Sequence, residues 1–239
     1  MRPVSDLKTI AKRRMAKNYG ILIGAAALTI LVGVTLYLTE SAILVMGVDF
    51  RRIESLNDLI DVFSSPALIA MNYGLSLIVS LLLALFMTGY KRICLIVARD
   101  LKPSLSDLLF PFKYNPDKVI LLSFIIWIVS TIGSLTSFLT GSEETGGVSM
   151  LDGRVFFAGM VLEVVSLALL IAVSSWLFAG YYIYLDDPDR PVVSIIRQSV
   201  QMMRGNVLRL IYLTLTFTGW FLLVILTYGV ALLYVAPYM

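Results

Sequence analysis

The sequence predicts an all-α protein that crosses a membrane several times, a polytopic α-helical membrane protein. Hydrophobic residues make up 59% of the chain, charged residues only 15%, and the mean hydropathy is +0.88. An ordinary soluble domain carries about 25% charged and about 45–50% apolar residues. Several uncharged windows reach about 20 residues, the length that a helix needs to cross the hydrocarbon layer. Transmembrane strands would instead give short alternating segments, so we expect one helical membrane domain over residues 1–239.

The apolar windows predict five complete spans and a truncated sixth. The complete spans are expected at about 19–38, 67–88, 119–140, 155–184 and 207–226, and the partial span at 230–239. One long helix over 207–235 is the alternative for the end of the chain. The first window follows a basic flank as in a signal peptide. It has full spanning length and no small-residue cleavage site at its end, so we expect it to be retained.

Three amphipathic segments precede the first, third and fifth spans, at 5–18, 104–112 and 190–204. Each has an apolar face, and basic residues lie within it or directly beside it, which is typical of helices that lie on the membrane surface. Lys and Arg concentrate around these segments, whereas acids dominate the 40–66 and 141–154 loops. The positive-inside rule therefore predicts a protein of the cytoplasmic membrane with its N-terminus on the cytoplasmic side.

The residue inventory excludes most kinds of active site. The chain has no histidine and Cys94 is its single cysteine, so disulfides, thiolate zinc sites and histidine-dependent triads cannot form within one chain. Walker and Gly-x-Ser-x-Gly motifs are also missing from the sequence. The net charge of +3 is modest, and the bases lie beside apolar runs. We therefore expect no enzymatic activity, no cofactor, no metal and no nucleic-acid partner, and expect membrane lipids as partners.

A short corner recurs where each surface segment meets a span: a base followed within two residues by asparagine. The three corners contain Lys17 with Asn18, Lys113 with Asn115, and Arg204 with Asn206. We interpret the asparagine carbonyl as a cap for the first N–H groups of the span. Lys17, Lys113 and Arg204, together with Arg209 just inside the fifth span, are predicted to contact lipid head groups. Whether the corners mark an internal repeat or a recurring solution to membrane entry is left open.

Four polar residues within the spans are candidates for ligand binding or proton-linked function. Glu163 is an acid in a long apolar run, and an ionisable group within the membrane is a functional candidate because its burial is costly. The alternative is that Glu163 lies at the outer interface. Asn72 is a candidate to line a ligand cavity. Ser130 and Ser134 recur at helical spacing as a polar track, or as hydroxyls that join neighbouring helices.

Small residues at the start of the first span predict close helix packing. Gly20 and Gly24 form a Gly-x-x-x-Gly motif, followed by three alanines. Such faces allow two membrane helices to approach closely, within one chain or between two copies. Packing within the chain is the preferred interpretation.

The C-terminal part of the chain carries a family resemblance. The motifs are Met203-Arg204-Gly205-Asn206, Thr216-Phe217-Thr218-Gly219-Trp220-Phe221-Leu222-Leu223, Leu226-Thr227-Tyr228-Gly229 and Ala236-Pro237-Tyr238-Met239. This signature resembles a bacterial integral-membrane family, domain of unknown function 975, which typically shows a Met-Lys-Gly-Asn corner, a Gly-Trp pair and a Pro-Tyr motif before a last amphiphilic stretch. The resemblance implies a membrane protein and supplies no functional residues.

Two functions remain open from the sequence. The first is a non-enzymatic component that binds or transports a lipid or another apolar ligand between its helices. The second is a structural or accessory subunit that docks another membrane protein, or a second copy of itself. Small residues on the first and fourth spans, including Ala168, Ala172 and Ala179, favour the second function.

Overall fold

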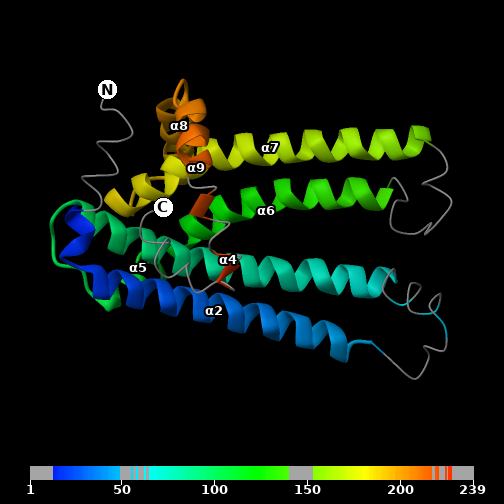
Figure 1. Cartoon of the computed structure of the whole chain (residues 1–239), viewed down its shortest axis with the longest axis horizontal. Helices are drawn as coiled ribbons and strands as arrows, with labels where there is room; N and C mark the ends of the chain where they lie inside the picture. The colour runs from blue at the N-terminus through cyan, green and yellow to red at the C-terminus, as the bar shows by residue number, and fades with distance from the viewer. Residues whose placement is uncertain are drawn as a thin grey trace. The chain divides into compact units, whose positions relative to one another are not determined.

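The computed structural model describes residues 13–48, 65–139 and 153–216, together with residues 55, 58, 62, 219, 220, 224, 226 and 227. All regular structure in these ranges is helical (Figure 1), which confirms the predicted all-α class. The elements are α2 (Tyr19–Met46), α4 (Pro66–Ala98), the 3-10 helix η2 (Leu105–Leu109), α5 (Phe110–Lys113), α6 (Pro116–Leu139), α7 (Gly153–Asp186), α8 (Val192–Met203) and α9 (Val207–Leu215).

The number of predicted spans needs correction. By length and composition, α2, α4 and the Met160–Asp186 part of α7 can cross a membrane. Leu105–Lys113 with Pro116–Ile132 qualifies only as a pair bent by 86°, so the described residues hold three spans, or four with this pair, instead of five and a partial sixth. α9 has nine residues, which at about 1.5 Å each cover roughly half of the hydrocarbon layer. Residues 230–239 lie outside the described ranges.

The chain divides into two compact units. Unit 1 comprises Met1–Gly33, Leu83–Leu122 and Ser175–Met239, and unit 2 comprises Val34–Leu82 and Ser123–Ser174. Each is described separately below.

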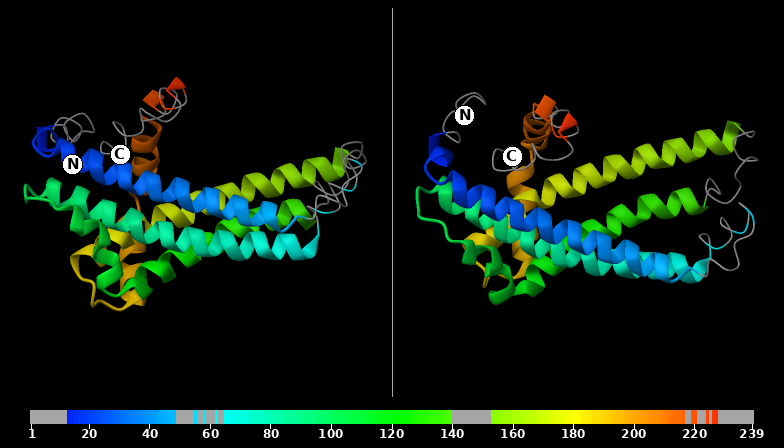
Figure 2. Two further views of the ribbon diagram at one scale, coloured as in Figure 1. Left: turned by 90° about the horizontal axis from the view of Figure 1, so that it is seen from below. Right: turned by 60° about the horizontal axis from the view of Figure 1, so that its bottom comes forward.

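Unit 1 has a small apolar core between the start of α2 and the end of α4. Leu22 and Ala25 of α2 pack with Ile93 and Val97 of α4, and all four are almost fully buried. Leu108 of η2 joins the same cluster. Figures 1 and 2 show α2 and α4 side by side at this end. The core thus joins the two long helices to the short segment that follows α4.

In unit 2 the long helices keep much of their apolar surface exposed. Gly47, after α2, lies against Met71 and Leu68 of α4, and the Trp127 indole N–H of α6 lies 3.4 Å from the Ser76 hydroxyl of α4. Between Val161 and Ile171, nearly every side chain of α7 is exposed. An α-helix that is apolar on all sides is typical of a membrane span.

The segments predicted to lie on the membrane surface are helical where the structure describes them, and their place at the membrane stays a prediction. The predicted segment 104–112 contains η2 and the start of α5. The predicted segment 190–204 contains α8, whose N-cap is Pro191. In Figure 2, α8 turns away from the end of α7. Of residues 5–18, only 13–18 are described, and residues 13–16 are helical. The first span was expected to end near residue 38, but α2 continues to Met46 because the sequence after 38 stays free of helix-breaking residues.

Candidate functional site: the basic end of unit 1

Gly89 of α4 positions the segment η2–α5 against the long helix. A Cβ atom at Gly89 would come within 1.9 Å of the Leu108 carbonyl oxygen. The backbones of α4 and η2 therefore meet directly at this point, and only glycine fits there. Leu108 itself is buried in the core, which holds η2 from the other direction.

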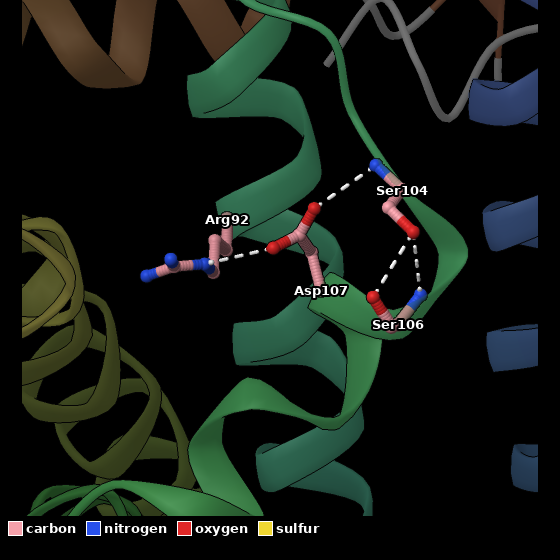
Figure 3. Close-up of polar contacts among 4 residues, drawn as sticks. All are labelled: Arg92, Ser104, Ser106 and Asp107. Atoms are coloured by element: carbon pink, nitrogen blue, oxygen red, sulfur yellow. Dashed lines mark hydrogen bonds and ion pairs between the residues drawn. The ribbon is translucent and has the colours of Figure 1, made fainter.

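Asp107 links η2 to α4 and caps η2 at the same time (Figure 3). One carboxylate oxygen accepts a hydrogen bond from the Ser104 N–H at 2.9 Å, and the other lies 3.4 Å from Nε of Arg92. The Ser104 hydroxyl accepts a hydrogen bond from the Ser106 N–H. This capping box satisfies N–H groups that the start of a helix leaves open.

Aromatic rings extend the contact between α4 and the η2–α5 segment. The Arg92 guanidinium carbon lies 3.3 Å from the centre of the Phe110 ring, which stacks on Tyr114. Phe86 and Phe112 meet edge to face with ring centres 5.0 Å apart. Arg92 is therefore bound by a carboxylate and an aromatic face together, which fixes its side chain.

The turn from α5 into α6 is bonded to the turn after α7. Asn115 has a positive φ of 48°, and its side-chain amide donates to the Pro188 carbonyl and to Asp189, at 3.0 Å each. Lys118 also donates to the Pro188 carbonyl, and the Tyr184 hydroxyl donates to the Tyr114 carbonyl. These bonds join residues that are 70 to 74 positions apart in the sequence.

α8 docks on α7 through a small-residue contact. The buried Ser199 hydroxyl donates to the Trp176 carbonyl at 2.5 Å, and Gly180 lies beneath Ile195 and Ser199. α8 ends at Met203, and Gly205 takes the left-handed conformation, with φ of 78°, that helix ends favour. α8 is thus anchored to α7 by one face.

The predicted capping role of Asn206 is wrong. α9 starts after Asn206, but the Asn206 side chain makes no capping hydrogen bond. Its amide donates back to the Met202 carbonyl, at the end of α8. Asn206 therefore stabilises the end of the helix before it and not the start of the helix after it.

Most of the carboxylates at this end of unit 1 are already paired. Asp100 pairs with Arg14, Asp186 with Arg99, and Asp187 with Arg190. Bases nevertheless outnumber acids among the described residues of unit 1. The thirteen bases are Arg13, Arg14, Lys17, Lys91, Arg92, Arg99, Lys102, Lys113, Lys118, Arg190, Arg197, Arg204 and Arg209, and the six acids are Asp100, Asp107, Asp117, Asp186, Asp187 and Asp189. The unit is strongly basic after its ion pairs are formed.

Lys91 differs from the neighbouring cations Arg92 and Arg99 because its described contacts are aromatic rings and include no acid. Its ammonium lies 3.8 Å from the centre of the Tyr181 ring and 6.0 Å from that of Phe178, both on α7. Among the described residues, every ion pair involves an arginine and none involves Lys91. The preceding residue, Tyr90, has a buried hydroxyl beside Cys94 that has no nitrogen or oxygen partner in the part of the chain that the structure describes.

The residues predicted to contact lipid head groups all lie in unit 1. Lys17, Lys113 and Arg204 are exposed, and Arg209 is half-buried. In the predicted packing motif, a Cβ on Gly20 would meet no atom within 4 Å, whereas one on Gly24 would lie 3.9 Å from Leu105. The positions of the four bases are compatible with head-group contact, which stays a prediction.

The polar candidates within the spans lie in unit 2. Asn72 of α4, Ser130 of α6 and Glu163 of α7 are exposed, so they form no buried site. The Ser130 hydroxyl donates to the Trp127 carbonyl of its own helix at 2.7 Å. Ser134 belongs to α6, but its side chain lies outside the described part of the structure. No group of three or more metal-ligating side chains occurs within the described ranges.

The central residues of the site were missed in the sequence. Gly89, Lys91 and Arg92 are not among the residues that the sequence analysis predicts for a site. The signals that were present are the Asp three residues after the capping Ser104 and a single glycine between large side chains at the end of a span. The pairing of Lys91 with Tyr181 has no local signal, because 90 residues separate them.

The long apolar helices and the basic end with its docked surface segments are characteristic of an integral membrane protein. Within that class, the chain belongs to the family described as protein of unknown function (DUF975), which matches it over residues 1–239. No curated protein and no solved structure matches the chain.

Proposed function

We propose that the chain is a non-catalytic, multi-pass protein of the cytoplasmic membrane that binds a lipid or another apolar ligand, alone or as a component of a transport system. In this proposal the basic end of unit 1 and the N-terminus are on the cytoplasmic side. The excess of Lys and Arg in unit 1 supports this orientation under the positive-inside rule.

The observation that carries the proposal is the η2–α5 segment, which is fixed in place and still exposes apolar side chains. It is fixed to α4 through Gly89, Arg92 and the buried Leu108. Three of its large apolar residues nevertheless remain exposed in part: Leu105, Leu109 and Phe112. An apolar face that is rigidly mounted beside an excess of bases suits the boundary between acyl chains and anionic head groups.

An accessory subunit is the second candidate, because α7 exposes apolar side chains on all sides between Val161 and Ile171. Another membrane protein or a second copy of the chain would cover that surface as well as lipid does. The two functions differ in what remains bound after gentle extraction.

Native mass spectrometry of the protein extracted with its own membrane lipids tests the proposal. A defined lipid or small apolar molecule at fixed stoichiometry is the expected result. A retained protein instead would favour the accessory subunit, and the bare chain alone would contradict lipid binding.

Glu163 provides a separate test of proton-linked transport. The variant Glu163→Gln removes the charge without changing the side-chain size. If Glu163 is proton-linked, ligand flux in vesicles loses its pH dependence in the variant. Unchanged binding and flux would remove Glu163 from the transport proposal and leave it as an interfacial residue.

A further inference from the structure

Lys91 lies in a candidate membrane helix and has aromatic rings as its described contacts. A cation over an aromatic face gains about 0.5–1 kcal/mol at exposed sites and about 2 kcal/mol or more where water is excluded. Removing an ammonium from water costs more than this unless a counter-charge is present. An apolar side chain would fill the same position without that cost. The positive charge of Lys91 is therefore expected to serve a function that an apolar side chain could not.

The anion that complements Lys91 does not come from the nearby acids of the described chain. Asp107, on the neighbouring segment, is bound to Arg92, and Asp186, near the end of α7, is bound to Arg99. Lys91 differs from Arg92 and Arg99 in this respect, although all three lie in or directly after the last turns of α4. Within the described ranges Lys91 has no acid as an ion-pair partner, and an external anion would supply the counter-charge.

Two apolar neighbours of Lys91 are exposed. Phe178 and Met87, which lies one turn before Lys91 on α4, are both exposed large hydrophobic residues. Lys91 lies seven residues before the end of α4, so its backbone is about 10 Å from that end. This depth places an ammonium on a flexible side chain within reach of lipid phosphates at the membrane boundary.

We propose that Lys91, positioned by the Tyr181 and Phe178 rings, binds the phosphate of an anionic phospholipid whose acyl chains lie along Met87 and Phe178. This inference rests on the lipid-binding function proposed above and assigns the head group. A choline head group is disfavoured because its quaternary ammonium would meet the positive charge of Lys91 and would compete for the same aromatic faces.

The test compares two lipids with identical acyl chains, phosphatidylglycerol and phosphatidylcholine, mixed in equal amounts and presented to the purified full chain. Native mass spectrometry measures the ratio of the two bound lipids. The wild-type chain is expected to favour phosphatidylglycerol, and Lys91→Gln is expected to lower the bound ratio by roughly tenfold, toward one, as for the loss of one charge-assisted contact.

Three further variants control this comparison. Lys91→Arg keeps the charge and should retain the preference. Lys102→Gln removes an exposed base from the segment after α4 and should also retain it. Phe178→Leu keeps Lys91 and the exposed apolar position but removes a ring, and should weaken the preference even if Lys91→Gln fails to fold.

The outcomes separate the inference from the function on which it rests. Equal preference in wild type and Lys91→Gln, with lipid still bound, would overturn the Lys91 assignment and leave lipid binding intact. A similar loss in Lys102→Gln would also overturn the assignment, because it would indicate a diffuse basic surface. A wild-type chain that retains neither lipid would contradict lipid binding itself.

Discussion

Units 1 and 2 are built from the same long helices but differ in how polar side chains are used. In unit 1, polar side chains connect elements that are far apart in the sequence, as Arg92 does with Asp107, Asn115 with Pro188, and Ser199 with Trp176. In unit 2, the hydroxyls of Ser80 and Ser130 donate to carbonyls of their own helices. Trp127 with Ser76 is a contact between helices there.

The charges follow the same division. Unit 1 carries the basic excess described above, whereas the described residues of unit 2 contain one base, Arg154, and three acids, Glu40, Asp58 and Glu163. Apolar contact between helices gains little in a membrane, because lipid tails are equally apolar. We infer that the specific interactions of this protein are concentrated in unit 1, while the surface of unit 2 is covered without head-group selectivity.

The largest expected difference between the units is in the stability effect of replacing a glycine of α4 by alanine. Gly89→Ala in unit 1 places a methyl group against the Leu108 backbone and should destabilise the protein by about 3 kcal/mol or more, because the backbone has to shift. Gly74→Ala in unit 2 meets no atom within 4 Å and should stabilise by up to about 1 kcal/mol through helix propensity. Thermal unfolding in detergent measures both variants, and equal Tm values would contradict the docking of η2 on α4.

The second expected effect is at the capping carboxylate. Asp107→Ala removes a cap and an ion pair that are about one quarter exposed, at 25% for Arg92 and 22% for Asp107, and should cost about 2 kcal/mol. Asp186→Ala removes an ion pair that is about half exposed, at 52% and 51%, and should cost less than about 1 kcal/mol. Denaturant unfolding distinguishes the two. A larger loss in Asp186→Ala would mean that the exposed pair, and not the cap, holds this end of unit 1.

Two tyrosines of unit 1 give the third comparison. Tyr184→Phe leaves the Tyr114 carbonyl without its donor and should cost about 1–2 kcal/mol. Tyr90→Phe removes a buried hydroxyl that has no nitrogen or oxygen partner, so stability should stay equal or rise. Tm measurements under identical lipid conditions check both. A clear loss of stability in Tyr90→Phe would reveal a bond of that hydroxyl to Cys94 or to bound water.

The smallest expected effect is that of single serines. Ser199→Ala in unit 1 breaks the bond from α8 to α7 and should cost about 1 kcal/mol. Ser130→Ala in unit 2 removes an exposed hydroxyl that bonds to its own helix and should leave the Tm unchanged. Protease cleavage near residue 204 offers a local readout, because α8 should become accessible in Ser199→Ala alone.

The helical class, the long apolar helices and the short helices at 105–113 and 192–203 were predictable because they follow from local hydrophobic periodicity. Leu105 and Leu109 recur at helical spacing, and Pro191 marks the start of α8. The number of spans was overestimated because a window of apolar residues near 207–226 does not determine where a helix ends. The structure describes α9 only as far as Leu215.

The site was less predictable because its residues gain their roles from distant partners. Arg92 and Lys91 are adjacent bases in the sequence, yet one is bound by a carboxylate and the other lies over aromatic rings. Asn206 was interpreted as a cap from its position, but in the structure its amide turns toward the preceding helix. Local patterns specify which side chains are polar, whereas tertiary packing specifies which of them are paired.

The difference in lipid selectivity between the units is tested most directly by fluorescence quenching with brominated lipids. Two single-tryptophan proteins are compared: one retains Trp176, an exposed residue of unit 1 close to Phe178 in the sequence, and the other retains the half-buried Trp127 of unit 2. We expect brominated phosphatidylglycerol to quench Trp176 more strongly than brominated phosphatidylcholine, and both lipids to quench Trp127 equally. Equal quenching of Trp176 by the two lipids would contradict a head-group-selective site in unit 1.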